Sequence, residues 1–276
     1  MNMNWLESLI YGLLSGISEF LPISSAAHQQ ILLRLFGIDT RDPVRDFFVH
    51  IAILAAVITA CKSFLELVKR EQSIRDRNRH PVQHTFVALH DWRVVQGAVL
   101  PMLIAMLFLR YIIKLSGNLL ISALFLFLNG VILFLPERMV QGNKDGRSMS
   151  AFDSILIGLS GALSIFSGIS RVGCTYSVAV ARGAAKKHAF SWALLLSISA
   201  LACLAFMDVV AMFSGVSVAF WSNFLTYILS GITAYFGCYF SITVMRILIT
   251  RPSNHGFAFY CWGASLFSLI LYLTVA

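Results

Sequence analysis

The chain has 276 residues, of which 58% are hydrophobic and only 12% are charged, and its mean hydropathy is +0.78. A soluble domain carries about 25% charged residues, so this composition excludes an ordinary soluble protein and indicates a single integral membrane domain over 1–276. The net charge of +8 does not indicate a nucleic-acid partner, because basic residues beside membrane spans are the usual mark of cytoplasmic loops.

Apolar segments recur along the whole chain, and six of them reach the roughly 20 residues needed to cross about 30 Å of hydrocarbon. In chain order these predicted spans are 46–68, 93–113, 118–136, 189–212, 220–248 and 256–275. Two other apolar segments, 5–36 and 151–185, are interrupted by FLPISS and FSGISR, where proline, glycine and serine break a single helix. We expect each of these two segments to form two short helices joined at membrane depth.

Positive charge orients the predicted spans. The longest hydrophilic loop is expected in the cytoplasm because it carries Lys69, Arg70, Arg75, Arg77 and Arg79. If successive spans alternate in direction from this loop, the first interrupted segment enters the membrane from the outer side and returns to that side. The second interrupted segment then enters from the cytoplasm and returns to it, so the two hairpins should point at each other.

These predictions combine into one fold class. We expect an all-α polytopic membrane protein with six transmembrane helices and two opposed re-entrant helix hairpins, arranged as an inverted repeat with halves of about 1–136 and 151–276. A weak internal similarity agrees with this, since LSGISEFLPISS (Leu14 to Ser25) aligns with LSGALSIFSGISR (Leu159 to Arg171) after one extra residue.

The two helix breaks carry the candidate site. Non-helical backbone at membrane depth is tolerated only where it is buried in protein or lines a wet cavity. The polar residues at the breaks are Glu19, Ser24, Ser25 and His28 in the first, and Ser167, Ser170, Arg171 and Thr175 in the second. A charge at the centre of a membrane helix costs about 2.5 to 3.5 kcal/mol, so Glu19 and Arg171 are either a functional pair in one wet chamber or a structural ion pair.

The residue types at the breaks suit an anionic substrate. Arg171 offers a planar fork of donors that matches phosphate oxygens. His28 is the usual kind of general acid or base near neutral pH, and the hydroxyl of Ser25 can act as a nucleophile or as a phosphate donor. His50, at the start of the first predicted span, either lines the mouth of the site or has a simple interfacial role, and Asp208, near the end of a span, can reach water without a special purpose.

The motifs resemble a known family. SGISEFLPISSAAH resembles the first signature of the undecaprenyl-pyrophosphate phosphatases, and SGISRVGCT resembles their second. Weaker similarities, such as FFVHIAILAAV and NGVILFLPER, follow in the family's order, so the resemblance covers nearly the whole chain. It implies six spanning helices, two opposed re-entrant hairpins, and an enzyme that is a phosphatase.

The reaction implied by the resemblance is hydrolysis of undecaprenyl pyrophosphate to undecaprenyl phosphate and inorganic phosphate. It implies a plasma-membrane protein whose active site opens to the outer side, and a role in recycling the cell-wall lipid carrier and in bacitracin resistance. It also implies a divalent cation, Mg²⁺ or Ca²⁺, and a polyprenyl pyrophosphate among the surrounding membrane lipids as partner. It allows a homodimer.

Matching the signatures position by position assigns roles to seven residues. Glu19 becomes the second acid of the family's acidic pair and a candidate metal ligand, while Ser25 and His28 become catalytic residues of the first signature. Arg171 becomes both catalytic and phosphate-binding. The remaining phosphate-binding positions are Ser24, Ser170 and Thr175.

The chain departs from the family pattern at several positions. Ser15 stands where the family has Glu or Gln, which removes a group that helps hold metal or water. Ser167 replaces a proline, Val172 replaces a serine, and Ala26 and Ala27 lack a hydroxyl that is often present there. Two alternatives on the same fold therefore remain open: a polyprenyl-phosphate transporter or flippase, and a relative that binds the lipid without hydrolysing it.

Overall fold

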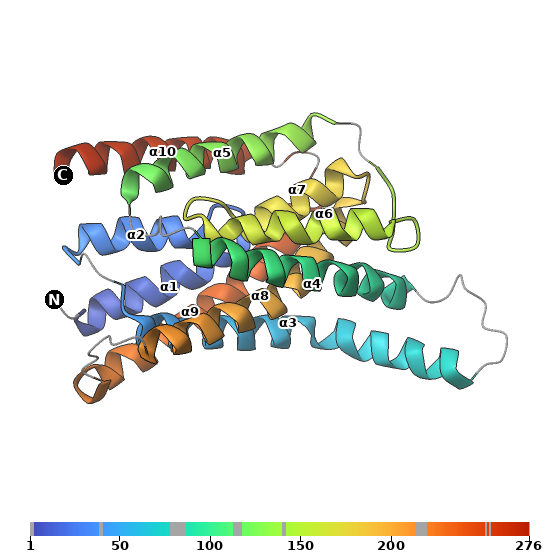
Figure 1. Cartoon of the computed structure of the whole chain (residues 1–276), viewed down its shortest axis with the longest axis horizontal. Coiled ribbons are helices and arrows are strands. Elements are labelled where there is room, and N and C mark those ends of the chain that lie inside the picture. Colours follow the sequence, from blue (N-terminus) through green and yellow to red (C-terminus); the bar gives the residue numbers. More distant parts are fainter. Residues whose placement is uncertain are drawn as a thin grey trace.

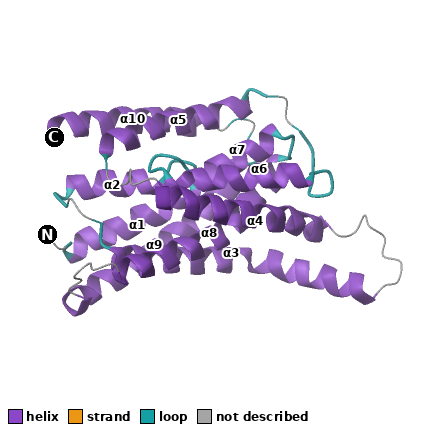
Figure 2. Ribbon diagram, in the orientation of Figure 1, coloured by secondary structure: helices purple, strands orange, loops and turns teal. Residues whose placement is uncertain are grey.

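A computed structural model shows that the chain is helical along nearly all of its described length (Figures 1 and 2). The structure describes residues 3–38, 41–77, 87–112, 118–139, 142–213, 220–251, 253 and 255–275. These residues form helices and one isolated β-bridge, between Lys144 and Ala184. The helices are α1 (Trp5–Phe20), α2 (Ser25–Leu35), α3 (Pro43–Arg77), α4 (Val87–Ile112), α5 (Leu119–Glu137), α6 (Ala151–Ala162), the short 3₁₀ helix η2 (Leu163–Ile165), α7 (Arg171–Ala181), α8 (Lys186–Phe213), α9 (Phe220–Leu248) and α10 (His255–Val275).

Six of the described helices, α3, α4, α5, α8, α9 and α10, are long and apolar enough to cross a membrane. The six predicted spans overlap them one for one, so the prediction of an all-α, multi-pass membrane protein is confirmed. Helix α3 is longer than its predicted span and continues through Lys69 and Arg70, because straight-chain charged residues are good helix formers. Arg79, the last cation of that predicted loop, lies outside the described residues.

The two interrupted segments form the helix pairs α1–α2 and α6–α7. Helix α1 ends at Phe20 because Pro22 disfavours a helical conformation in Leu21, which is extended. Helix α6 ends in the turn of η2, and the backbone reverses at Gly168, whose φ is +115°. Figure 1 shows the two pairs extending from opposite ends of the bundle, with their turns towards its middle. The depth of these turns in the membrane stays a prediction.

Helices of the two predicted halves pack against each other in an exchanged pattern. The order of a helix pair followed by three long helices occurs twice along the chain. Helix α1 lies against α9 while α6 lies against α4, and α3 lies against α9 while α8 lies against α4. Helices α3 and α8 pack together, as do α5 and α10. An inverted repeat produces such an exchange, although the exact limits of the two halves stay a prediction.

Two glycines bring α1 into close contact with α9. A Cβ atom on Gly12 would lie 2.1 Å from the carbonyl oxygen of Ser230, and one on Gly16 would lie 2.2 Å from that of Ala234. Residues four apart share one face of a helix, and small residues on such a face let membrane helices approach closely. The position of the first hairpin therefore depends on the absence of side chains here.

We expect Gly16→Ala to lower the free energy of unfolding by about 1–3 kcal/mol, because the added methyl group forces α1 away from α9. Denaturation of the purified protein in detergent measures this change. Gly263→Ala in α10 is the matched control, since a Cβ atom there meets nothing within 4 Å. The control should be neutral or should stabilise the helix by up to about 1 kcal/mol. Equal effects of the two substitutions would contradict close packing at Gly16.

Candidate active site

A cavity of about 290 Å³ lies where the two helix breaks meet. Residues from both hairpins and from the long helices around them line it, and they carry charges of both signs. The polar lining residues are Glu19, Ser25, Gln29, Arg41, Asp46, His50, Arg110, Ser164, Ser170, Arg171 and Asp208. Because a low-dielectric surround strengthens electrostatic interactions, the placement of these charges decides what the cavity can bind.

Glu19 and Arg171 form an ion pair at this cavity. The guanidinium of Arg171 donates to the carboxylate of Glu19, and the two side chains are only 3% and 12% exposed. The prediction that the two residues meet is therefore confirmed. Arg171 Nε is buried and has no hydrogen-bond partner among the described residues. A buried donor without a partner costs about 1–3 kcal/mol, which an anionic ligand oxygen would offset.

The backbone at the start of α7 adds positive character to the cavity. Ser170 is the N-cap of α7, and its side-chain oxygen accepts a hydrogen bond of 3.1 Å from the Gly173 N–H. Arg171 is the first residue of the helix, so the helix begins at the cavity lining. The N-terminal end of a helix carries a partial positive charge that favours anions.

Asn129 of α5 ties the two breaks together. Its Nδ2 donates to the Pro22 carbonyl oxygen at 3.0 Å, and its Oδ1 accepts from the Ser170 N–H at 2.9 Å. A second bond joins the turns directly, since the Gly168 N–H donates to Ser24 Oγ at 3.0 Å. Asn129 is not among the residues predicted for the site, although a lone amide within an apolar span is a signal of a functional or packing role.

His50 and Asp208 form a second polar pair in the cavity. His50 Nδ1 lies 2.6 Å from Asp208 Oδ2, and both side chains are 17% exposed. A carboxylate that binds one ring nitrogen fixes the orientation of the imidazole and leaves the other nitrogen for proton transfer. The structure confirms the alternative that His50 lines the site. It places Asp208 in the same lining with Glu19 and Arg171, rather than only at the membrane interface, because α3 and α8 pack together.

Three predicted site residues lie outside the lining of this cavity. His28 Nδ1 bonds to the Ser24 carbonyl oxygen at 2.8 Å, and its Nε2 lies 2.8 Å from the hydroxyl of Tyr260, on which the ring stacks. The hydroxyl of Thr175 donates to the Arg171 carbonyl oxygen at 2.8 Å. Ser24 Oγ accepts the hydrogen bond from the Gly168 N–H in the turn of the second hairpin. The structure therefore does not place His28, Ser24 and Thr175 in the cavity lining with Glu19, and their catalytic and phosphate-binding roles stay predictions.

The comparisons with known proteins agree with the motifs and the fold. The family model described as bacitracin resistance protein BacA matches residues 8–267. The chain belongs to the BacA family. It is 30% identical over 274 residues to a protein of Methanobrevibacter smithii named undecaprenyl-diphosphatase, covering 94% of this chain and 95% of that protein. It is also 29% identical over 273 residues to undecaprenyl-diphosphatase 3 of Bacillus cereus, covering 99% of both.

In this BacA-family chain a neighbouring amide bonds to Ser15, the position where the resemblance implies Glu or Gln. Ser15 is fully buried, and its Oγ accepts a hydrogen bond of 3.0 Å from Gln29 Nε2. Gln29 in turn accepts from Arg41, and Ser25 donates to the Ser15 carbonyl oxygen at 3.2 Å. An amide therefore reaches the cavity from α2, four residues after Ser25, although position 15 itself offers only a hydroxyl.

The predicted divalent cation can be compared with the acidic and histidine side chains that the structure describes. Among the described residues, no group of three His, Cys, Asp or Glu side chains is close enough to hold a metal ion. The carboxylate of Glu19, the predicted ligand, is occupied by Arg171. Mg²⁺ is often held by one or two carboxylates together with substrate phosphates, so a cation that arrives with a pyrophosphate stays a prediction.

Proposed function

We propose that this protein hydrolyses undecaprenyl pyrophosphate to undecaprenyl phosphate and inorganic phosphate, as a multi-pass protein of the plasma membrane that recycles the cell-wall lipid carrier. The observation that carries the proposal is the buried Arg171, whose Nε has no partner among the described residues and which lines a cavity beside a carboxylate and a carboxylate-bound histidine. Membership of the BacA family and the names of the relatives support the same reaction.

Binding of the pyrophosphate rests on the second hairpin. Arg171 donates to the phosphate oxygens while Glu19 holds its guanidinium in place. The N-terminal end of α7 adds backbone dipoles that favour the same negative charge. Since phosphoryl transfer depends mainly on positioning and on compensation of phosphate charge, these groups supply the largest part of catalysis.

His50, paired with Asp208, acts as the general base and acid of the reaction. A water molecule attacks the terminal phosphorus and gives its proton to His50 Nε2, while Asp208 holds Nδ1. The bond from that phosphorus to the bridging oxygen breaks, and undecaprenyl phosphate leaves with the electron pair. His50 then returns its proton to a phosphate product. The hydroxyl of Ser25 donates to the Ser15 carbonyl oxygen rather than to a base, which favours water as the nucleophile.

If the basic stretch that begins at Lys69 lies in the cytoplasm, the active-site cavity lies towards the outer side of the membrane. Its lining includes Pro43 at the start of α3, Arg110 near the end of α4 and Ala211 near the end of α8. The basic stretch that begins at Lys69 lies near the opposite end of α3 (Figure 1). Basic segments beside spans stay in the cytoplasm, so the cavity belongs to the outer half of the bundle.

Transport of a polyprenyl phosphate is the second candidate function. The observation that favours it is the exchanged packing of α1 on α9 and of α6 on α4, since inverted repeats of this kind also build alternating-access transporters. A charged cavity enclosed by both hairpins suits either function.

Phosphate release from undecaprenyl pyrophosphate by the purified protein, with and without Mg²⁺ or Ca²⁺, tests the proposal. We expect release by the wild type and a loss of at least about 100-fold in Glu19→Ala, because Arg171 then loses the group that positions it. A wild type that binds the lipid, moves it across vesicles and releases no phosphate would favour transport instead. Ser191→Ala is a control that should keep full activity, because this half-buried hydroxyl donates to the Lys187 carbonyl oxygen near the start of α8 and does not line the cavity.

A further inference from the structure

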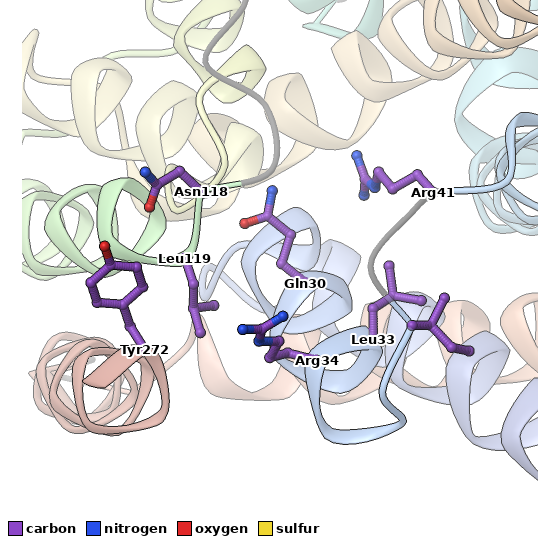
Figure 3. Close-up of a pocket in the computed structure, with 8 residues that line it drawn as sticks. Gln30, Leu33, Arg34, Arg41, Asn118, Leu119 and Tyr272 are labelled. Carbon is purple, nitrogen blue, oxygen red and sulfur yellow. The ribbon is translucent and has the colours of Figure 1, made fainter. Parts of the chain in front are cut away.

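A second guanidinium, that of Arg41, lines the active-site cavity together with Arg171. Arg41 belongs to the short segment between α2 and α3, whereas Arg171 begins α7, so the two cations come from different halves of the chain. Arg41 also lines a neighbouring cavity of about 360 Å³, and Figure 3 shows its side chain extending from the segment before α3 towards helix α2, which carries Gln30. No step of the proposed hydrolysis uses Arg41.

Two side chains hold Arg41 on the active-site side. Its guanidinium donates to the amide oxygen of Gln29, and its Nε lies 3.6 Å from Asp46 Oδ2. Gln29 and Asp46 both line the active-site cavity, and neither lines the neighbouring one. The position of the guanidinium is therefore set by partners that belong to the active-site cavity.

Asp46 is fixed by a contact of its own. The hydroxyl of Tyr11 donates to Asp46 Oδ1 at 2.7 Å, and both residues are buried. The other carboxylate oxygen of Asp46 is the one that faces Arg41. A guanidinium that is held by fixed partners has less conformational freedom to lose when it binds a ligand, so these contacts pre-organise Arg41.

The contacts with Gln29 and Asp46 leave Arg41 able to bind a ligand. A guanidinium has five N–H donors, which is more than one hydrogen bond and one ion pair require. Arg171 is in the same situation, since it lines the cavity while it is paired with Glu19. Each of the two guanidiniums is thus held by a carboxylate and carries a planar array of donors that matches phosphate oxygens.

Two such guanidiniums in one cavity match a ligand with two phosphate groups. We propose that Arg41 is a specificity-determining residue, which binds one phosphate of the pyrophosphate while Arg171 binds the other. The cavity then prefers a polyprenyl pyrophosphate to the corresponding monophosphate, which has only one group to offer. The same preference separates substrate from product. This inference rests on the proposed substrate, but it does not depend on hydrolysis.

The binding of undecaprenyl pyrophosphate and of undecaprenyl phosphate to the full chain in detergent tests this inference. Native mass spectrometry measures both affinities, and the mass of the complex shows which of the two lipids is bound. We expect the wild type to prefer the pyrophosphate. Arg41→Gln should weaken pyrophosphate binding about tenfold, because it removes a charge-assisted hydrogen bond, and should change monophosphate binding less than about twofold. Arg41→Lys keeps the charge without the planar fork and should keep only part of the preference.

Arg45→Gln is the matched control, because Arg45 lies one helical turn from Arg41 and does not line the cavity. The Arg45 guanidinium lies 3.5 Å from Asp42 Oδ2 and 5.3 Å from the centroid of the Tyr11 ring. Its loss should lower stability but leave the ratio of the two affinities unchanged. A purely structural role of Arg41 would weaken the binding of both lipids alike, and that result would overturn the inference.

The ratio of affinities also separates this inference from the proposed reaction. If the wild type prefers the pyrophosphate but releases no phosphate, and Arg41→Gln loses the preference, the reaction is refuted and the role of Arg41 is supported. The role of Arg41 is overturned if the wild type binds the two lipids equally well, or if Arg41→Gln keeps the wild-type ratio. It is also overturned if Arg45→Gln changes the ratio as much as Arg41→Gln does.

Discussion

Arg171→Gln is expected to abolish phosphate release and to lower the free energy of unfolding by about 3–5 kcal/mol, the usual cost of removing one partner from a buried ion pair. The substitution leaves the carboxylate of Glu19, which is only 12% exposed, without its cation. It also removes the guanidinium that lines the cavity beside Glu19. Phosphate-release assays and denaturation in detergent measure the two effects separately.

The double variant Glu19→Gln/Arg171→Gln separates structure from chemistry. Two neutral amides can bond to each other, so most of the lost stability should return, because no unpaired charge remains buried. Hydrolysis should not return, since no guanidinium is left for the phosphate. A double variant that hydrolyses the lipid at the wild-type rate would show that the ion pair is purely structural, which is the alternative that the sequence leaves open.

The sequence was sufficient to predict the six spans and the meeting of Glu19 with Arg171. Long apolar runs identify spans by length alone, and Pro22 and Gly168 identify the two breaks by their backbone requirements. A charge inside an apolar segment is conspicuous, and two opposite charges at two breaks have few ways to be satisfied other than with each other. Counting crossings then brings the breaks together without any knowledge of packing.

The rest of the site depends on which faces of distant helices pack together. The residues of a single helix do not determine this packing. His50 and Asp208 are 158 residues apart, and nothing in either segment says that α3 and α8 present them to the same cavity. The position of His28 also depends on helix packing, although its own segment allowed a prediction. Its distance from Glu19 along the hairpin allows contact, but the rotation of α2 turns its ring towards Tyr260 on α10.

Substitution of these two histidines should affect kcat very differently. His50→Gln should lower kcat by about 10²–10⁴-fold, the usual contribution of general acid–base catalysis, because glutamine can bond to Asp208 but cannot carry the proton. His28→Gln, the matched substitution, should keep kcat within about tenfold of the wild type, since that side chain lies outside the cavity lining and bonds to Tyr260. Steady-state hydrolysis of undecaprenyl pyrophosphate by both variants gives the comparison.

The order of the two effects decides which histidine transfers the proton. Asp208→Asn should lower kcat in the same direction as His50→Gln, and combining the two should add little, because the residues act as one unit. Tyr260→Phe removes the hydroxyl that bonds to His28 Nε2 and should leave kcat nearly unchanged. If His28→Gln proves the more damaging substitution, the proton passes through the histidine of the first signature, and α2 must rotate in the substrate complex to bring that ring to Glu19.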